Sequence, residues 1–90
     1  MTRAVAEELS DEHKQFIVQY LNENHEMLTD YLQVFEFSIT GDKQLLRQKQ
    51  EQPQRETQIF VPLKATKAIS RTVWVMDQVD HVMILFPEDY

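Results

Sequence analysis

A chain of 90 residues with a net charge of −6 and no cysteine excludes a disulfide framework, a thiolate nucleophile and a cysteine-ligated metal site. Its length favours one domain, residues 1–90, and its 42% share of hydrophobic residues argues against disorder. The first residues lack the apolar core of a signal peptide, and no apolar run approaches the ~20 residues that span a bilayer. We therefore expect a cytoplasmic protein without a membrane partner.

Charge is unevenly distributed along the chain. Residues 1–30 hold seven acids and two bases, residues 31–76 hold seven bases and four acids, and residues 77–90 hold four acids and no base. Charged residues most often form solvated surface that keeps a small protein soluble. The basic middle also leaves open a patch for an anionic partner, for which the candidates are Arg47, Lys49, Arg55 and Arg71.

The N-terminal third predicts a short strand followed by a helix. Residues 3–6 fit a first edge strand. Ser10 is a typical helix N-cap, and Asp11 and Glu12 place negative charge in the first turn, where the helix dipole favours it. The stops at Asn24 and His25 predict a helix of about 13–15 residues. One stripe of apolar side chains recurs along it: Phe16, Ile17, Tyr20 and Leu21.

The middle of the chain predicts strands joined by turns. Residues 31–40 alternate like a strand, and Gly41, the only glycine, lies in the turn that follows. Residues 47–56 contain no apolar side chain, which predicts an exposed hairpin tip with Pro53 near its bend. Residues 57–61 predict the next strand, ended by a proline.

The last quarter predicts the strand pair around which the rest of the chain is organised. Residues 73–76 and 82–86 are rich in β-branched and aromatic side chains and are separated by a short polar break. Both runs are apolar on both faces, which is typical of strands covered on two sides. We therefore expect this pair at the centre of the sheet.

These elements predict an α+β fold in which one N-terminal helix packs on an antiparallel sheet of about four to five strands. One helix covers one face of such a sheet, so the far face needs either a curled sheet or a second subunit. We favour a homodimer over curling. The candidates for the self-association surface are Trp74, Met76, Met83 and Leu85.

The sequence offers few groups for catalysis. A single glycine excludes a phosphate-cradling loop, the serines lack a Gly-x-Ser-x-Gly motif, and the three histidines lie in separate elements. We therefore expect no cofactor and no catalytic residues, although an enzyme stays open. Asp77, Asp80 and His81 form the densest polar cluster and could hold a divalent cation, although aspartate is also a common turn residue.

Several stretches of the chain resemble a known family. They are residues 2–5 (Thr-Arg-Ala-Val), 31–37 (Tyr-Leu-Gln-Val-Phe-Glu-Phe) and 50–53 (Gln-Glu-Gln-Pro), with the endings at 73–77 and 83–90. On these residues the chain is similar to the bacterial Domain of Unknown Function nine-sixty family. The resemblance implies a small stand-alone protein that is uncharacterised, and it supplies no site residues.

The sequence is compatible with three classes of function. The first is a non-catalytic protein–protein interaction module that self-associates. The alternative is a nucleic-acid-associated regulator that uses the basic hairpin 47–55, although its lack of aromatic side chains and the acidic helix argue against nucleic acid. The third, a hydrolase or metal-dependent enzyme built around residues 77–81, lacks a recognisable nucleophile–base pair.

Overall fold

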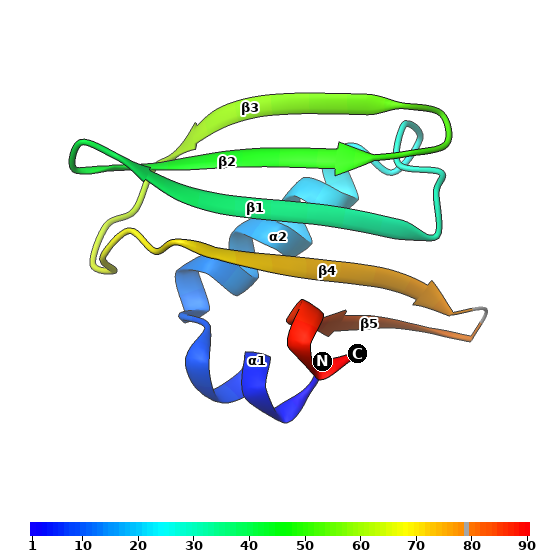
Figure 1. Cartoon of the computed structure of the whole chain (residues 1–90), viewed down its shortest axis with the longest axis horizontal. Coiled ribbons are helices and arrows are strands. Elements are labelled where there is room, and N and C mark those ends of the chain that lie inside the picture. Colours follow the sequence, from blue (N-terminus) through cyan, green and yellow to red (C-terminus); the bar gives the residue numbers. More distant parts are fainter. Residues whose placement is uncertain (79) are drawn as a thin grey trace.

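The computed structural model describes residues 1–78 and 80–90, which form an antiparallel sheet with a long helix packed on one face (Figure 1). The helices are α1 (Arg3–Glu8), α2 (Asp11–Glu23) and the short 3-10 helix η1 (Pro87–Asp89). The strands are β1 (Leu32–Thr40), β2 (Lys43–Gln50), β3 (Arg55–Val61), β4 (Arg71–Gln78) and β5 (His81–Leu85). The α+β class and the predicted helix on an antiparallel sheet are confirmed. In the described ranges, no helix is both long and apolar enough to cross a membrane.

The strands lie in the order β3-β2-β1-β4-β5, and each neighbouring pair is antiparallel. Strand β1 therefore lies at the centre of the sheet, between β2 and β4. A tight turn joins β1 to β2, whereas a long stretch of chain separates β1 from β4. The prediction that the C-terminal pair lies at the centre is wrong, because β4 is an inner strand but β5 is an edge. Val82 on β5 is accordingly 52% exposed.

The predicted first edge strand is also wrong, because residues 3–6 belong to α1. The hydroxyl of Thr2 caps this helix by accepting a hydrogen bond from the Val5 N–H at 3.3 Å. Val5 and Leu9 are buried in the core cluster, so tertiary packing stabilises a helix of only six residues.

The predicted helix is confirmed as α2, with Ser10 as its N-cap and Asn24 as its C-cap. Its apolar stripe packs on the sheet: Tyr20 meets Phe35 of β1 edge to face, with ring centroids 5.7 Å apart. The Tyr20 hydroxyl also lies 2.8 Å from the hydroxyl of Thr57 on β3. The helix thus spans the sheet behind β2, β1 and β4 (Figure 1).

The opposite face is partly covered by the chain's own C-terminus. In Figure 1, η1 lies in front of the sheet, on the side away from α2. Tyr90 brings its ring within 5.9 Å of the Trp74 ring, edge to face. Met76 and Leu85, which share this face, are 8% and 4% exposed. The described chain therefore buries these two side chains without a second subunit.

Glutamines, rather than apolar residues, fill the α2-facing side of β2 beside Leu46. Gln44, Gln48 and Gln50 alternate with half-buried neighbours and are all buried. The prediction that residues 47–56 form an exposed tip is therefore wrong for the first four of them, which continue β2. Only the turn 51–54, which includes Pro53, is exposed throughout. These amides remain buried because each is hydrogen-bonded, a property that composition does not reveal.

The carboxylates of Glu12 and Asp30 hold two loops in place by accepting hydrogen bonds from their backbone N–H groups. Glu12 on α2 accepts hydrogen bonds from the N–H groups of Lys64 and Ala65 and from the Thr66 hydroxyl, at 2.7–2.8 Å. These bonds, that from Lys64 first, lower the pKa of Glu12 from 4.5 to about 2. Asp30 likewise accepts from two N–H groups of the β2–β3 turn, and its pKa is lowered chiefly by the bond from Gln52.

Candidate functional site

One edge of the sheet is covered and the other is open. On the covered side, the Thr2 N–H donates to the Ile84 carbonyl of β5 at 2.9 Å, and α1 and both termini lie beside this strand (Figure 1). On the open side, Figure 1 shows no ribbon beyond β3. Within residues 1–78 and 80–90, β3 forms backbone ladder bonds with β2 alone. The outer side of β3 is thus a free strand edge.

The register identifies which backbone groups of β3 point outward. In an antiparallel pair, each residue directs its N–H and C=O to the same neighbour, and successive residues alternate. Ile84 directs its carbonyl outward to Thr2, so its partner Val75 directs its own groups toward β1. Asp77, two residues on, agrees by donating to the Tyr31 carbonyl at 2.8 Å. The same alternation of inward and outward residues can be followed along the paired residues from β4 to β1, then to β2 and β3. It gives three residues of β3 whose backbone groups point outward: Glu56, Gln58 and Phe60.

The side chains at this edge are mostly uncharged beyond the first two positions. Thr57, Gln58, Ile59, Phe60 and Val61 carry no charge, and Phe60 is 58% exposed. Natural edges are usually protected by charge, proline or a covering segment. Here charge is confined to the start of the strand and proline to the residue after its end. An uncharged, pairing-competent segment of five residues remains between them, of which Gln58 and Phe60 are exposed.

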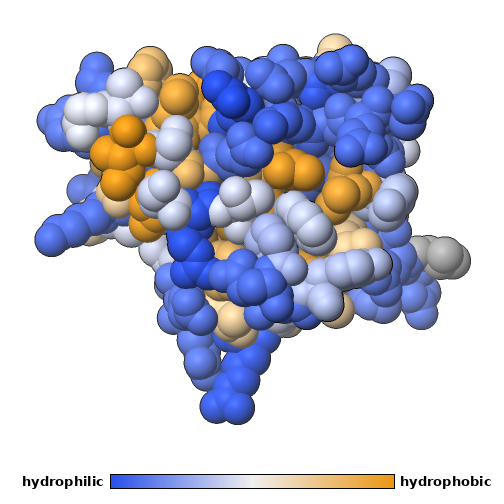
Figure 2. Space-filling view, viewed as in Figure 1, coloured by the Kyte–Doolittle hydropathy of each residue, from blue (hydrophilic) through white to orange (hydrophobic). Residues whose placement is uncertain are grey.

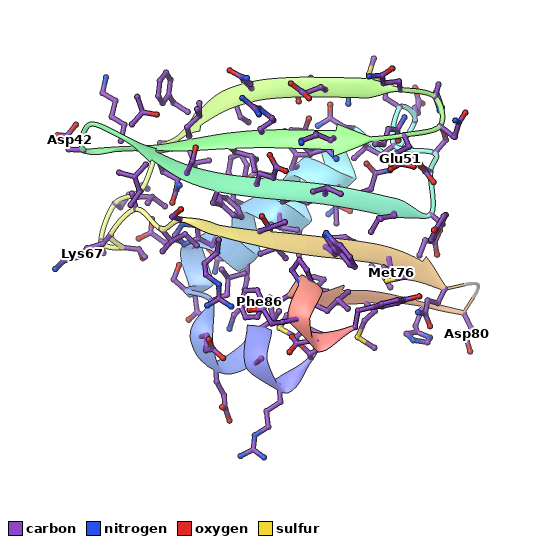
Figure 3. All side chains as sticks on the ribbon, viewed as in Figure 1. Asp42, Glu51, Lys67, Met76, Asp80 and Phe86 are labelled. Carbon is purple, nitrogen blue, oxygen red and sulfur yellow. The ribbon has the colours of Figure 1, made fainter. Side chains whose placement is uncertain are left out.

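Two shallow grooves flank the ends of β3. One, of about 430 Å³, lies beside the β2–β3 turn, where Figure 3 labels Glu51. The other, of about 740 Å³, lies near the β1–β2 turn, where Figure 3 labels Asp42. Its lining includes Lys43, whose ammonium lies 5.6 Å from the centroid of the Phe60 ring. In Figure 2, apolar surface gathers over this second end of the sheet, whereas the upper right is hydrophilic.

The comparisons with known proteins agree with this fold. A family model described as a Staphylococcal protein of unknown function (DUF960) matches residues 1–89. The chain belongs to this family. A crystal structure of a protein of unknown function from Enterococcus faecalis superposes with a TM-score of 0.85 at 19% sequence identity, covering 99% of this chain and 86% of that one. This second likeness concerns the fold alone. The curated proteins contain no match.

In this DUF960 chain, three of the four basic candidates predicted for an anionic partner lie beside acidic groups. Lys49 pairs with Glu36 at 2.9 Å, and Arg47 lies 3.6 Å from Glu56. Arg71 reaches both Glu8 and Glu88, at 3.1 and 3.3 Å, and its guanidinium stacks 3.7 Å from the centroid of the Phe86 ring. Arg55, at the start of β3, has one buried guanidinium nitrogen, Nη1, without a hydrogen-bond partner among the described atoms.

The four residues predicted for self-association of the DUF960 chain divide into two groups. Met76 and Leu85 are buried within the chain, and Trp74 and Met83 are half-buried. All four lie on the face opposite α2, as the shared registers of β4 and β5 require. The accessible part of this surface is therefore limited to Trp74 and Met83. None of the four lies on β3, whose open edge is at the opposite side of the sheet.

The predicted cation cluster lies at the β4–β5 turn, which also contains residue 79, outside the described residues. Asp77, Asp80 and His81 are exposed, and His81 Nδ1 lies 2.7 Å from Asp80 Oδ1. Across residues 1–78 and 80–90, no group of three or more histidine or acidic side chains is placed to hold a metal ion. Figure 3 shows Asp80 projecting from the end of this turn.

Sequence reasoning missed one serine–histidine contact in the DUF960 fold. Ser10 Oγ lies 2.6 Å from His13 Nδ1, and the same oxygen accepts the His13 N–H at 3.1 Å as the cap of α2. The spacing of three residues at a helix N-terminus was the available signal. Neither residue lines one of the two grooves beside β3. His13 is fully buried, so this contact fixes the start of α2 against the sheet.

Proposed function

We propose that this chain is a non-catalytic protein-interaction module that acts by self-association. The main observation that supports this is the contrast between the two sheet edges. Thr2 and α1 occupy the β5 edge, whereas the β3 edge keeps backbone donors and acceptors that no described residue pairs. A free strand edge is a ready template for another strand.

The composition of the edge also supports a protein partner. Strand pairing satisfies backbone groups regardless of sequence, and β-branched and aromatic side chains such as Ile59 and Phe60 strengthen cross-strand contacts. A second copy of the chain supplies an identical edge, and most soluble homo-oligomers form through such twofold interfaces.

Sedimentation equilibrium or light scattering across the micromolar range tests this proposal. We expect the average mass to rise with concentration from 10.8 kDa toward twice that value. A mass that stays at 10.8 kDa throughout would overturn self-association.

A further inference from the structure

We infer that two copies pair through antiparallel β3 strands, with Gln58 facing Gln58 of the second copy on the twofold axis. This inference rests on the proposed self-association and specifies its geometry. Only outward residues can exchange hydrogen bonds across the edge, which restricts the register, and an axis at Gln58 is the one that pairs all three of Glu56, Gln58 and Phe60.

This register satisfies the whole open edge. With Gln58 on the axis, Glu56 of one copy faces Phe60 of the other, and the reverse pair is identical by symmetry. Each of these facing pairs exchanges two backbone hydrogen bonds. Thr57 then faces Ile59 in the closer, non-bonded positions, where β-branched side chains pack well. The two sheets become one continuous sheet.

The side chains add charge complementarity to the backbone pairing. Lys43 holds its ammonium 5.6 Å from the centre of the Phe60 ring within its own chain. The facing pair brings Glu56 of the second copy to the other side of the same ring. Lys43 and the second copy's Glu56 thus approach each other across Phe60, and the symmetry gives two such contacts per dimer.

A heterodimer experiment tests this contact without depending on the stability of any one variant. Lys43→Glu places two carboxylates together at each contact of its own homodimer, and Glu56→Lys places two ammonium groups there. We expect each variant alone to dimerise about tenfold more weakly than the unchanged chain, or worse. In an equal mixture both contacts become opposite in charge, so dimerisation recovers. A mixture that dimerises no better than the separate variants would overturn the inference.

Cross-linking tests the register itself, because the chain has no cysteine of its own. Facing residues in a bonded antiparallel pair have Cα atoms about 5.5 Å apart, within disulfide range. Gln58→Cys is therefore expected to form a covalent dimer under mild oxidation. Glu56→Cys is the register control, since its two copies lie about 13 Å apart and are not expected to link. Gln15→Cys, on the exposed face of α2, controls for random collision.

The outcomes separate this inference from the proposed function. If the Gln58→Cys variant dimerises by mass but forms no disulfide, the β3 pairing is overturned and self-association is left standing. A chain of constant monomer mass overturns both. A disulfide-linked dimer of the Gln58→Cys variant, together with recovery in the charge mixture, supports both.

Discussion

His13 Nε2 on α2 lies 2.9 Å from Gln44 Oε1 on β2, and both side chains are buried. The amide nitrogen of Gln44 donates to the carbonyls of Ser38 and Ile69, at 2.7 and 3.0 Å, so its oxygen faces donors. That oxygen accepts the Ile69 N–H at 2.8 Å. His13 Nε2 is therefore the donor to Gln44, and in the neutral imidazole Nδ1 can accept from the Ser10 hydroxyl. Gln44 thus joins the helix, the sheet and the loop before β4.

Gln44→Leu is expected to lower the free energy of unfolding by about 2–4 kcal/mol, because it leaves several buried partners of the amide unsatisfied. Urea denaturation measures this loss. Gln15→Leu, on the exposed face of α2, is the matched control and should change stability by less than about 0.5 kcal/mol. Equal effects of the two substitutions would contradict a structural role for the buried amide.

A second chain of amides predicts non-additive mutations. Gln48 donates to Gln33 and Gln33 donates to Gln50, each at 2.8 Å, and Gln50 donates onward to the Met27 and Pro53 carbonyls at 3.1 and 2.9 Å. Gln33→Leu removes one hydrogen bond from the buried amide on either side and is expected to cost about 2–3 kcal/mol.

Once Gln33 is leucine, Gln48→Leu removes an amide that has already lost its partner on β1. The double variant should therefore lose less stability than the sum of the single losses, by about 1 kcal/mol. A double-mutant cycle in urea measures this coupling. Losses that add to within about 0.3 kcal/mol would show that the amides act independently.

Glu12 gives the protein a component of stability that depends on pH. The hydrogen bonds from the 64–66 loop lower its pKa to about 2 in the folded chain, below the ordinary value of 4.5. Because the folded pKa is the lower one, the charged carboxylate stabilises the fold above pH 4.5, and this contribution is lost as the pH falls toward 2.

Glu12→Gln is therefore expected to be less stable than the unchanged chain at neutral pH, with the difference shrinking as the pH falls from about 4.5 to 2. Urea midpoints measured along this pH range provide the test. Glu26→Gln removes the same formal charge at an exposed site and serves as the control. A difference between Glu12→Gln and the unchanged chain that is constant with pH would contradict this account.

Local signals made part of the fold predictable from sequence. Ser10 caps α2 as expected, Ile17 is buried as its place in the apolar stripe requires, and Gly41 adopts a φ of 64° in its turn. Each of these depends on neighbours within one or two turns of chain. The burial of Gln48 and Gln50 was not predictable in this way, because their partners come from other segments.

Strand order depends on contacts between distant segments, so it was not predictable either. Apolar side chains on both faces of residues 82–86 indicated that other parts of the chain cover both faces of this strand. The core lies against one face and the C-terminal η1 against the other, although β5 is an edge strand. The strand at residues 57–61 was predicted, but its edge position and the outward direction of Gln58 required the register.

Arg71 contributes through its planar guanidinium as well as its charge. It stacks 3.7 Å from the centroid of the Phe86 ring and reaches Glu8 and Glu88. Arg71→Lys keeps the charge but loses the planar guanidinium that stacks on the Phe86 ring. We expect the free energy of unfolding to fall by about 0.5–1.5 kcal/mol, and this loss should persist at high salt. Arg3→Lys is the control, because Arg3 is 90% exposed in its pair with Glu7. Arg71→Lys matching this control in urea would contradict the stacking argument.

Proline substitutions distinguish the two sides of β3, because proline removes one N–H at a chosen position. Gln58 directs its N–H outward, so Gln58→Pro keeps the β2 ladder and is expected to cost little stability while abolishing dimerisation. Thr57 directs its N–H to β2, so Thr57→Pro is expected to cost about 3 kcal/mol. Urea denaturation at low concentration and sedimentation at high concentration separate the two effects. A large loss of monomer stability in Gln58→Pro would contradict the assignment of outward groups on which the inferred β3 pairing rests.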